Sequence, residues 1–142
     1  MPQSSTIDGA SEGPARLPTV LIVDDESSIA RTLSLILEAH GYRAAIARSG
    51  DEAVEQARAS APDVFVCDIV MPGISGIEAA IQIRTLCPEC RIMLMSGNTV
   101  STELLDQARA RGHEFEVLAK PFHPTRLMEW LQGGAAVTHS GV

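Results

Sequence analysis

Short apolar runs alternate along the chain with stretches of helical periodicity, and this alternation constrains the fold more than any other feature. Five runs have the composition of strands, at 19–23, 43–47, 63–67, 91–95 and about 115–119. Three of them, VLIV, VFVC and IMLM, are continuous rather than alternating, which is typical of strands covered on both faces. The run at 43–47 is weaker, and we expect it near an edge of the sheet.

A helical pattern follows each of these runs. The first helical pattern ends near Gly41, and the second opens at Ser49 with a capping-box pattern. The third stops before Pro88, and the fourth spans about 99–110 with few apolar anchors. The last begins at Pro124. Five βα repeats joined by short loops predict an α/β fold with a doubly wound, five-stranded parallel sheet. Strand order 2-1-3-4-5 places the first and third strands at the switch point of this sheet.

The length of 142 residues fits one domain. Proline, glycine and serine are frequent in 1–18, and small residues are frequent in 133–142, which indicates a flexible N-terminal leader and a flexible C-terminal tail. We therefore expect the folded domain to span 19–132, with no room for a second domain at either end.

Charge and hydropathy exclude several classes of function. The net charge of −7 argues against direct nucleic-acid binding, and no predicted helix carries a stripe of lysine and arginine. No basic stretch leads into an apolar segment at the N-terminus, and the apolar runs are too short to span a membrane. Three cysteines in such a chain suggest reduced thiols. We expect a cytoplasmic protein without membrane contact.

Charged and hydroxyl side chains follow four of the apolar runs at the point where each run ends. Asp68 ends the third run, Asp24 and Asp25 follow the first, Ser96 follows the fourth, and Lys120 follows the fifth. Ligands of open parallel sheets bind beyond the carboxyl ends of the strands. Clustered carboxylates need compensating charge, which Mg²⁺ supplies in many proteins. The sequence thus predicts a magnesium site that could also hold a phosphoryl group.

Each of these residues also has an ordinary structural interpretation. Asp25 could cap a helix that starts at Glu26, a Lys-Pro pair is common in turns, and a Ser-Gly pair is common in loops. Taken singly, these interpretations are preferable. Their joint occurrence at four strand ends is poorly explained by chance.

The complete pattern resembles the CheY-like response-regulator receiver domains of two-component signalling, which have a flavodoxin-like (βα)5 receiver fold. The resemblance rests on the acidic pair Asp24-Asp25, the motif from Asp68 through Met71-Pro72 to Gly76, the pair Ser96-Gly97, and Lys120-Pro121-Phe122. It covers about residues 19–132 and therefore nearly all of the predicted domain.

The resemblance implies a role for each of these residues. Asp68 would be the phosphoacceptor, taking a phosphoryl group from a phosphohistidine of a sensor histidine kinase or a phosphotransfer protein. Mg²⁺ would be coordinated by Asp25, Asp68 and the backbone carbonyl of Val70, with Asp24 assisting through metal-bound water. Ser96, followed by the small Gly97, and Lys120 would bind the phosphoryl oxygens, and Lys120-Pro121 would be a cis peptide bond.

The resemblance also implies a signalling switch rather than a metabolic enzyme, one that assists its own phosphorylation and dephosphorylation. With no effector domain expected, we predict a stand-alone receiver whose output is the binding of an unidentified downstream protein or onward phosphoryl transfer. An aspartyl-phosphate hydrolase is an alternative, although such enzymes usually need a second acid where this chain has Val70. A non-phosphorylated adaptor is a further alternative, which the intact set of acids and Lys120 disfavours.

The chain departs from the family pattern in the switch region before Pro121. The family usually has an aromatic residue three positions before the lysine, whereas this chain has Val117 there. The nearest aromatic residue is Phe115. We therefore expect the signal to be read out through the loop after Ser96 and a weakly anchored fourth helix. Cys87 and Cys90 form a C-x-x-C pair. We expect no zinc site here because no further ligands are apparent, and no redox role because the pair follows the third helix and does not stand at a helix start.

Overall fold

The computed structural model describes residues 17–133, so that most of the predicted leader and tail lies outside the described part of the chain. Strands β1 (Thr19–Val23), β2 (Arg43–Ala47), β3 (Val64–Asp68), β4 (Arg91–Ser96) and β5 (Glu116–Ala119) form one sheet. All neighbouring strands are parallel, and their order is β2-β1-β3-β4-β5. The predicted fold class and strand order are confirmed.

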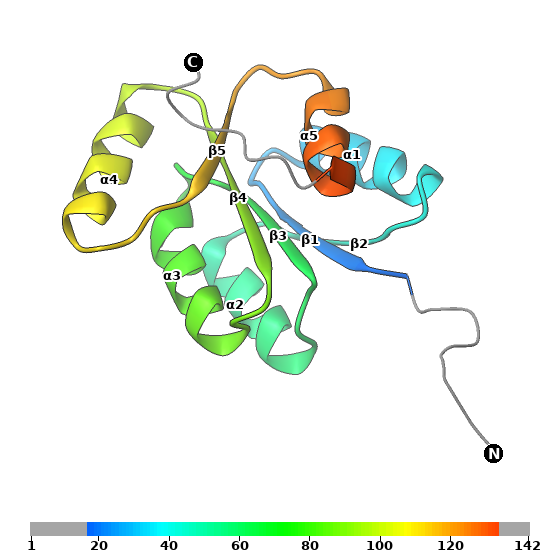
Figure 1. The fold of residues 1–142 in the computed structure, drawn as a ribbon, viewed down its shortest axis with the longest axis horizontal. Helices are drawn as coiled ribbons and strands as arrows, with labels where there is room; N and C mark the ends of the chain where they lie inside the picture. The colour runs from blue at the N-terminus through cyan, green and yellow to red at the C-terminus, as the bar shows by residue number, and fades with distance from the viewer. Residues whose placement is uncertain (1–16, 134–142) are drawn as a thin grey trace.

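Helices cover both faces of this sheet (Figure 1). They are α1 (Ser27–Ala39), α2 (Gly50–Ala59), α3 (Gly76–Leu86), α4 (Thr99–Ala110) and α5 (Pro124–Gly133). One apolar cluster lies between the sheet and the α2–α4 side, with Phe65, Ile83 and Leu94 among its fully buried members. A second cluster lies under α1 and α5 and includes Leu37 and Trp130. The continuous apolar strands are therefore buried on both faces, as their composition predicts.

Side-chain caps fix where three of the helices begin. The side chains of Ser49, Ser75 and Asn98 each accept a hydrogen bond from the backbone N–H three residues further along, at the starts of α2, α3 and α4. Helix α1 has no such cap: it begins after Glu26, and the alternative in which Asp25 caps it is wrong. Asp25 is thereby left available for another role.

Helix α4 is the least embedded of the helices, as its sequence indicates. Only Ser101 and Ala108 of its residues are buried, while Leu104 and Leu105 are partly exposed at the edge of the first apolar cluster. The helix therefore has few contacts to lose if it shifts against the sheet.

Far from the strand ends that carry the acids, Arg91 ties α5 to the start of β4. Its guanidinium donates hydrogen bonds of 3.1 and 2.9 Å to the carbonyls of Leu131 and Trp130, and it lies 4.1 Å from the centre of the Trp130 ring. The Trp130 indole N–H donates to Glu116 Oε1 at 2.8 Å. Trp130 is 1% exposed and belongs to the core.

Within residues 17–133, every helix is too short or too polar to cross a lipid bilayer.

Candidate functional site

Three carboxylates meet where β1 and β3 end. These strands are neighbours in the sheet although more than forty residues separate them in sequence, so Asp24 and Asp25, which follow β1, come next to Asp68 at the end of β3. One carboxylate oxygen of each of the three lies within 4.8 Å of the others. Among the described residues, this is the one group of three or more acids, histidines or cysteines so arranged.

Lys120, just after β5, joins two of these acids. Its Nζ lies 3.2 Å from Asp24 Oδ2 and 3.3 Å from Asp68 Oδ2. Asp24 is fully buried, and its other carboxylate oxygen accepts the Glu26 N–H at 2.9 Å. The Asp68 side chain is 13% exposed, and Asp25 is exposed. The three acids therefore differ in access: Asp24 is enclosed, Asp68 is partly accessible, and Asp25 faces solvent.

The electrostatics of Asp68 and Lys120 reflect this crowding. Burial raises the pKa of Asp68 above its ordinary value, with the nearby Asp24 adding to the rise and Lys120 opposing it. Burial alone would lower the pKa of Lys120, but the charges of Asp68 and Asp24 and its hydrogen bonds to them outweigh burial and raise that pKa. Ionised Asp68 is thus incompletely compensated by the protein, whereas Lys120 stays protonated.

These residues fit a hard divalent cation. Mg²⁺ prefers carboxylate, carbonyl and water oxygens and is usually held by one or two carboxylates with retained waters. The cluster offers oxygen donors from three carboxylates, one of which is open to water. Val70, two residues beyond Asp68 in the β3–α3 loop, is 38% exposed. Burial raises the pKa of Asp68 because its negative charge is poorly solvated there, and a bound cation would compensate that charge.

Gly76 holds the end of β3 in place, a function that the sequence alone does not show. Its N–H donates to the Ile69 carbonyl at 2.8 Å, at the point where α3 begins. A Cβ atom here would collide with the backbone carbonyl of Asp68 and approach the Cα of Ile69 at 2.9 Å. Only glycine lets the start of α3 lie this close to the strand end.

Ser96 and Gly97 lie beside Lys120 at the neighbouring strand end. The Lys120 N–H donates to the Ser96 carbonyl at 2.7 Å, which continues the β4–β5 ladder past its last strand pair. The Lys120–Pro121 bond is cis, as expected. Helix α4 starts three residues after Ser96, and its cap residue Asn98 accepts from both the N–H and the hydroxyl of Ser101.

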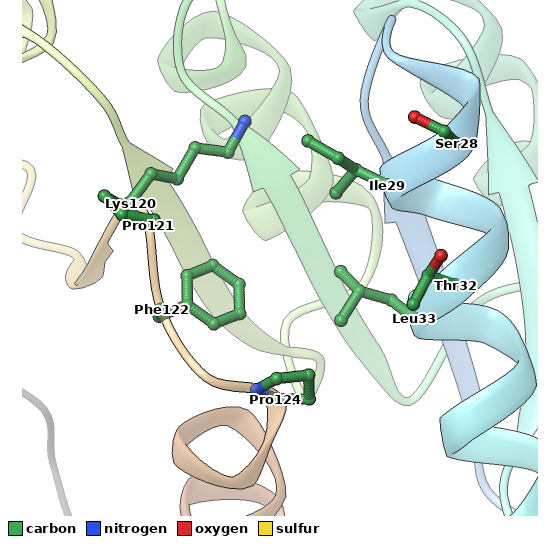
Figure 2. A pocket seen from close by; sticks show the side chains of 8 residues that line it. All are labelled: Ser28, Ile29, Thr32, Leu33, Lys120, Pro121, Phe122 and Pro124. Carbon is green, nitrogen blue, oxygen red and sulfur yellow. The ribbon is translucent and has the colours of Figure 1, made fainter.

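An apolar cleft of about 350 Å³ lies between α1 and the segment that follows β5. Figure 2 shows Ile29 and Leu33 pointing from α1 toward Lys120 and Phe122, with the Phe122 ring directed at the helix. This cleft adjoins the acidic cluster through Lys120.

Two residues of the predicted switch region, Val117 and Phe115, lie two positions apart, one within β5 and one just before it. Val117 is in the strand and 4% exposed. Phe115 precedes the strand, where its ring lies 4.2 Å from the Arg84 guanidinium and stacks with His113. Phe115 is therefore at the opposite end of β5 from Lys120, and β5 itself carries no aromatic residue.

The C-x-x-C pair has neither a disulfide nor the surroundings of a reactive thiol. Cys87 and Cys90 are both free. Burial raises the pKa of Cys87, and burial with the charges of Cys87 and Asp63 raises the pKa of Cys90 to about 12. Both groups are therefore protonated at neutral pH, which disfavours the redox interpretation.

Comparison with known proteins points to one family. The model of the response regulator receiver domain matches residues 20–132. Chemotaxis protein CheY of Thermotoga maritima is 34% identical over 113 residues, which make up 79% of this chain and 92% of that protein. The response regulator protein TrrA of the same organism, solved in complex with Mg²⁺-BeF, is 30% identical with a TM-score of 0.70; the match covers 82% of this chain and 98% of that one.

Some relatives are much longer than this chain. The transcriptional regulatory protein ZraR of Escherichia coli is 33% identical over 121 residues, which are 85% of this chain but only 27% of ZraR. The similarity therefore concerns a domain that occurs both in small proteins and as one part of larger ones.

Proposed function

The chain belongs to the response regulator receiver domain family, and from this premise we propose that it accepts a phosphoryl group on Asp68 and thereby changes how it binds a partner protein. Receiver domains are signalling domains rather than classical enzymes. They bind Mg²⁺ at an acidic pocket, and they interact with histidine kinases or phosphotransfer proteins and with downstream effectors.

One observation carries the choice of Asp68: it is the carboxylate that is both reachable and held by Lys120. Asp24 also contacts Lys120 but is fully buried, so a donor protein has no access to it. Asp25 is exposed, and no hydrogen bond or ion pair fixes its side chain among the described residues. Asp68 combines access with a neighbouring cation, which are the two properties that a phosphoryl acceptor needs.

In the proposed reaction, a carboxylate oxygen of Asp68 attacks the phosphorus of a phosphohistidine. A new O–P bond forms, the N–P bond breaks, and its electron pair remains on the imidazole nitrogen of the donor. Lys120, already 3.3 Å from Asp68, offers its ammonium to the phosphoryl oxygens, and Ser96 offers a hydroxyl from the adjacent strand end. Both interactions are stronger for the transferred group than for the free carboxylate.

Asp24, Asp25 and Asp68, together with the carbonyl of Val70, are the residues that we assign to Mg²⁺. When bound, the ion supplies positive charge that offsets the repulsion among the carboxylates and the incoming phosphoryl group. Asp24 also positions Lys120, because it is buried and fixed by the Glu26 N–H.

Readout is proposed to run from Ser96 through Asn98 into α4. A shift of Ser96 toward a phosphoryl group on Asp68 would pull the cap of a helix that is anchored by few buried residues. We further propose that the protein is a stand-alone, cytoplasmic receiver that assists its own dephosphorylation. The match over 92% of a chemotaxis CheY supports the first of these assignments.

The test is incubation with Mg²⁺ and acetyl phosphate, followed by measurement of the intact mass. We expect a gain of one phosphoryl group in the wild type, loss of the adduct in Asp68→Asn, and no change in Asp51→Asn, an exposed acid in the first turn of α2. Chelation of Mg²⁺ should also abolish the adduct. Absence of the adduct with every small phosphodonor would support an adaptor, and continuous phosphate release from simple phosphoesters would support a hydrolase.

A further inference from the structure

A turn that carries two cysteines joins α3 to β4. Cys87 follows the last residue of α3, and Cys90 precedes the first residue of β4. The Cys90 N–H donates to the Cys87 carbonyl at 3.0 Å, which closes a four-residue turn with Pro88 at the position where proline is favoured. The Cα atoms at the ends of such a turn lie less than about 7 Å apart. Both thiols are therefore confined to one small region.

The backbone of this turn is fixed at both ends, while its sulfur atoms are only weakly engaged. The Cys87 N–H donates to the Ile83 carbonyl of α3 at 2.7 Å, and the Arg91 N–H donates to the Asp63 carbonyl at 3.0 Å. Cys90 Sγ has one long contact, of 3.5 Å, with the Arg91 carbonyl. Among the described residues, the Cys87 thiol has no hydrogen bond. Both sulfur atoms are thus held near one another and remain available to a ligand.

The two thiols open onto the same cavity. It has a volume of about 490 Å³ and is lined by both cysteines, by Leu86 and by Pro62 of the loop before β3. Cys87 is 8% exposed and Cys90 is partly exposed, so a small ion can reach both from solvent. Because β3 and β4 begin here, the cavity lies at the edge of the sheet opposite to Asp68.

The surroundings of the cavity are negative. Asp63 and Glu89 line it, and none of its lining residues is lysine or arginine. Helix α3 also ends at the turn, and the C-terminus of a helix carries partial negative charge. Burial, together with the charges of Cys87 and Asp63, raises the pKa of Cys90 to about 12. These surroundings disfavour a bare thiolate and favour a positively charged ion.

The number and kind of ligands select the ion. Among the described residues, the only group of three or more acids, histidines or cysteines that converges on one point is the acidic cluster around Asp68, so the turn offers two sulfur ligands. A structural zinc ion takes four ligands, and Mg²⁺ and Ca²⁺ prefer oxygen. Soft thiolates select Cu(I), whose coordination two sulfur atoms complete in a linear arrangement.

We propose that Cys87 and Cys90 together bind one Cu(I) ion through their two sulfur atoms. Each thiol releases its proton to solvent as its S–Cu bond forms, so that Cu⁺ and two neutral thiols become a bis-thiolate complex with one negative charge. The copper stays monovalent, and no electron is transferred. This site is independent of phosphoryl transfer to Asp68, and the acetyl phosphate experiment decides nothing about it.

The test is competition for copper between the full chain and the chelator bathocuproine disulfonate, without oxygen and with the copper supplied as Cu(I). The chelator complex is coloured, and its fading measures the copper taken up by the protein. We expect one Cu(I) per chain, with the ultraviolet absorption of a copper–thiolate bond. Because two protons leave as the ion binds, the dissociation constant should fall about a hundredfold for each unit rise in pH between about pH 6 and 8.

Two variants each remove one sulfur ligand, so that a folding defect in one does not decide the result. Cys87→Ala and Cys90→Ser should each weaken Cu(I) binding more than about a hundredfold, because even groups that only orient a metal ligand contribute about 10–100-fold. The matched control is Cys67→Ala, which removes the third thiol of the chain from the buried part of β3 and should leave the dissociation constant unchanged. Glu89→Gln, which removes an exposed charge at the cavity, should weaken binding about two- to fivefold.

Four results would overturn the proposal. If Cys87→Ala and Cys90→Ser bind Cu(I) as the wild type does, the ion lies elsewhere on the chain. If one ion binds per two chains and the protein dimerises, the sulfur ligands come from two copies. If an equal concentration of Zn²⁺ displaces the copper, the assigned metal is wrong. If copper leaves the two thiols joined in a disulfide, seen as a loss of two hydrogens in the intact mass, the pair is oxidised and is not a ligand set.

Discussion

Replacing Gly76 by alanine should destabilise the domain and displace Asp68 through one added methyl group. The new Cβ would overlap the backbone carbonyl of Asp68 and lie 2.9 Å from the Cα of Ile69. Neither neighbour is the flexible end of a side chain, so relief requires a shift of the α3 start relative to β3. That shift would also strain the 2.8 Å hydrogen bond from Gly76 to Ile69.

The expected magnitude follows from two opposing effects. Overpacking of this kind costs about 1–3 kcal/mol, while alanine in place of glycine at a helix recovers up to about 1 kcal/mol of backbone entropy. The net loss in free energy of unfolding is therefore about 1–2 kcal/mol. For a domain of this size that corresponds to a fall in Tm of roughly 4–8 °C.

The assay pairs calorimetry with beryllofluoride titration. Gly97→Ala is the matched control: it is also beside the site, but its Cβ would lie 3.7 Å from the Lys120 side chain, an ordinary contact. We expect a small change in Tm for Gly97→Ala, and a lower Tm with weaker beryllofluoride binding for Gly76→Ala. The reasoning is refuted if Gly76→Ala keeps both the Tm and the binding of the wild type, or if Gly97→Ala loses as much as Gly76→Ala.

Three further predictions follow from the charges, thiols and caps. Because burial raises the pKa of Asp68, the folded state holds that proton more tightly than the unfolded state, and stability is lost as pH rises through the folded pKa. Asp68→Asn should therefore raise the Tm at pH 7 without Mg²⁺, and the difference in Tm between variant and wild type should disappear as the pH falls toward 3.8. Added Mg²⁺ should stabilise only the wild type. A variant with the Tm of the wild type at pH 7 would contradict this prediction. Burial raises the pKa values of Cys87 and Cys90. Both thiols should therefore react with iodoacetamide at pH 7.5 far more slowly in the folded protein than in urea, as followed by mass spectrometry. Equal rates would count against the assigned burial. Asn98→Ala should cost about 1 kcal/mol and speed hydrogen exchange across 99–103, whereas exchange that rises equally in α2 would argue against a local cap.

Composition alone locates the strands well, because a strand covered on both faces must be apolar throughout. Strands β1 and β2 coincide with the predicted 19–23 and 43–47. Strand β3 ends one residue later than predicted, since Asp68 still pairs with Met95 in the ladder, and a carboxylate at a strand end gives no apolar signal. The order of the strands was predictable from connection rules, and with it the meeting of the acids.

The finer contacts of the site depend on strand register and on how closely the elements approach, and neither can be predicted from a single sequence. Asp25 was a reasonable cap by residue type, yet the Glu26 N–H is satisfied by Asp24 instead. The bridging position of Lys120 and the close approach at Gly76 arise only once the sheet and α3 are packed.

The bridge made by Lys120 has a consequence for when the site comes into existence. Lys120 and Asp24 are 96 positions apart in sequence, and Lys120 and Asp68 are 52 apart. The pocket is thus assembled from the beginning, middle and end of the domain, and a chain still emerging during synthesis lacks it until β5 has docked. Ligand binding at this pocket therefore reports that folding is complete, because a chain whose β5 has not docked lacks Lys120 at the site.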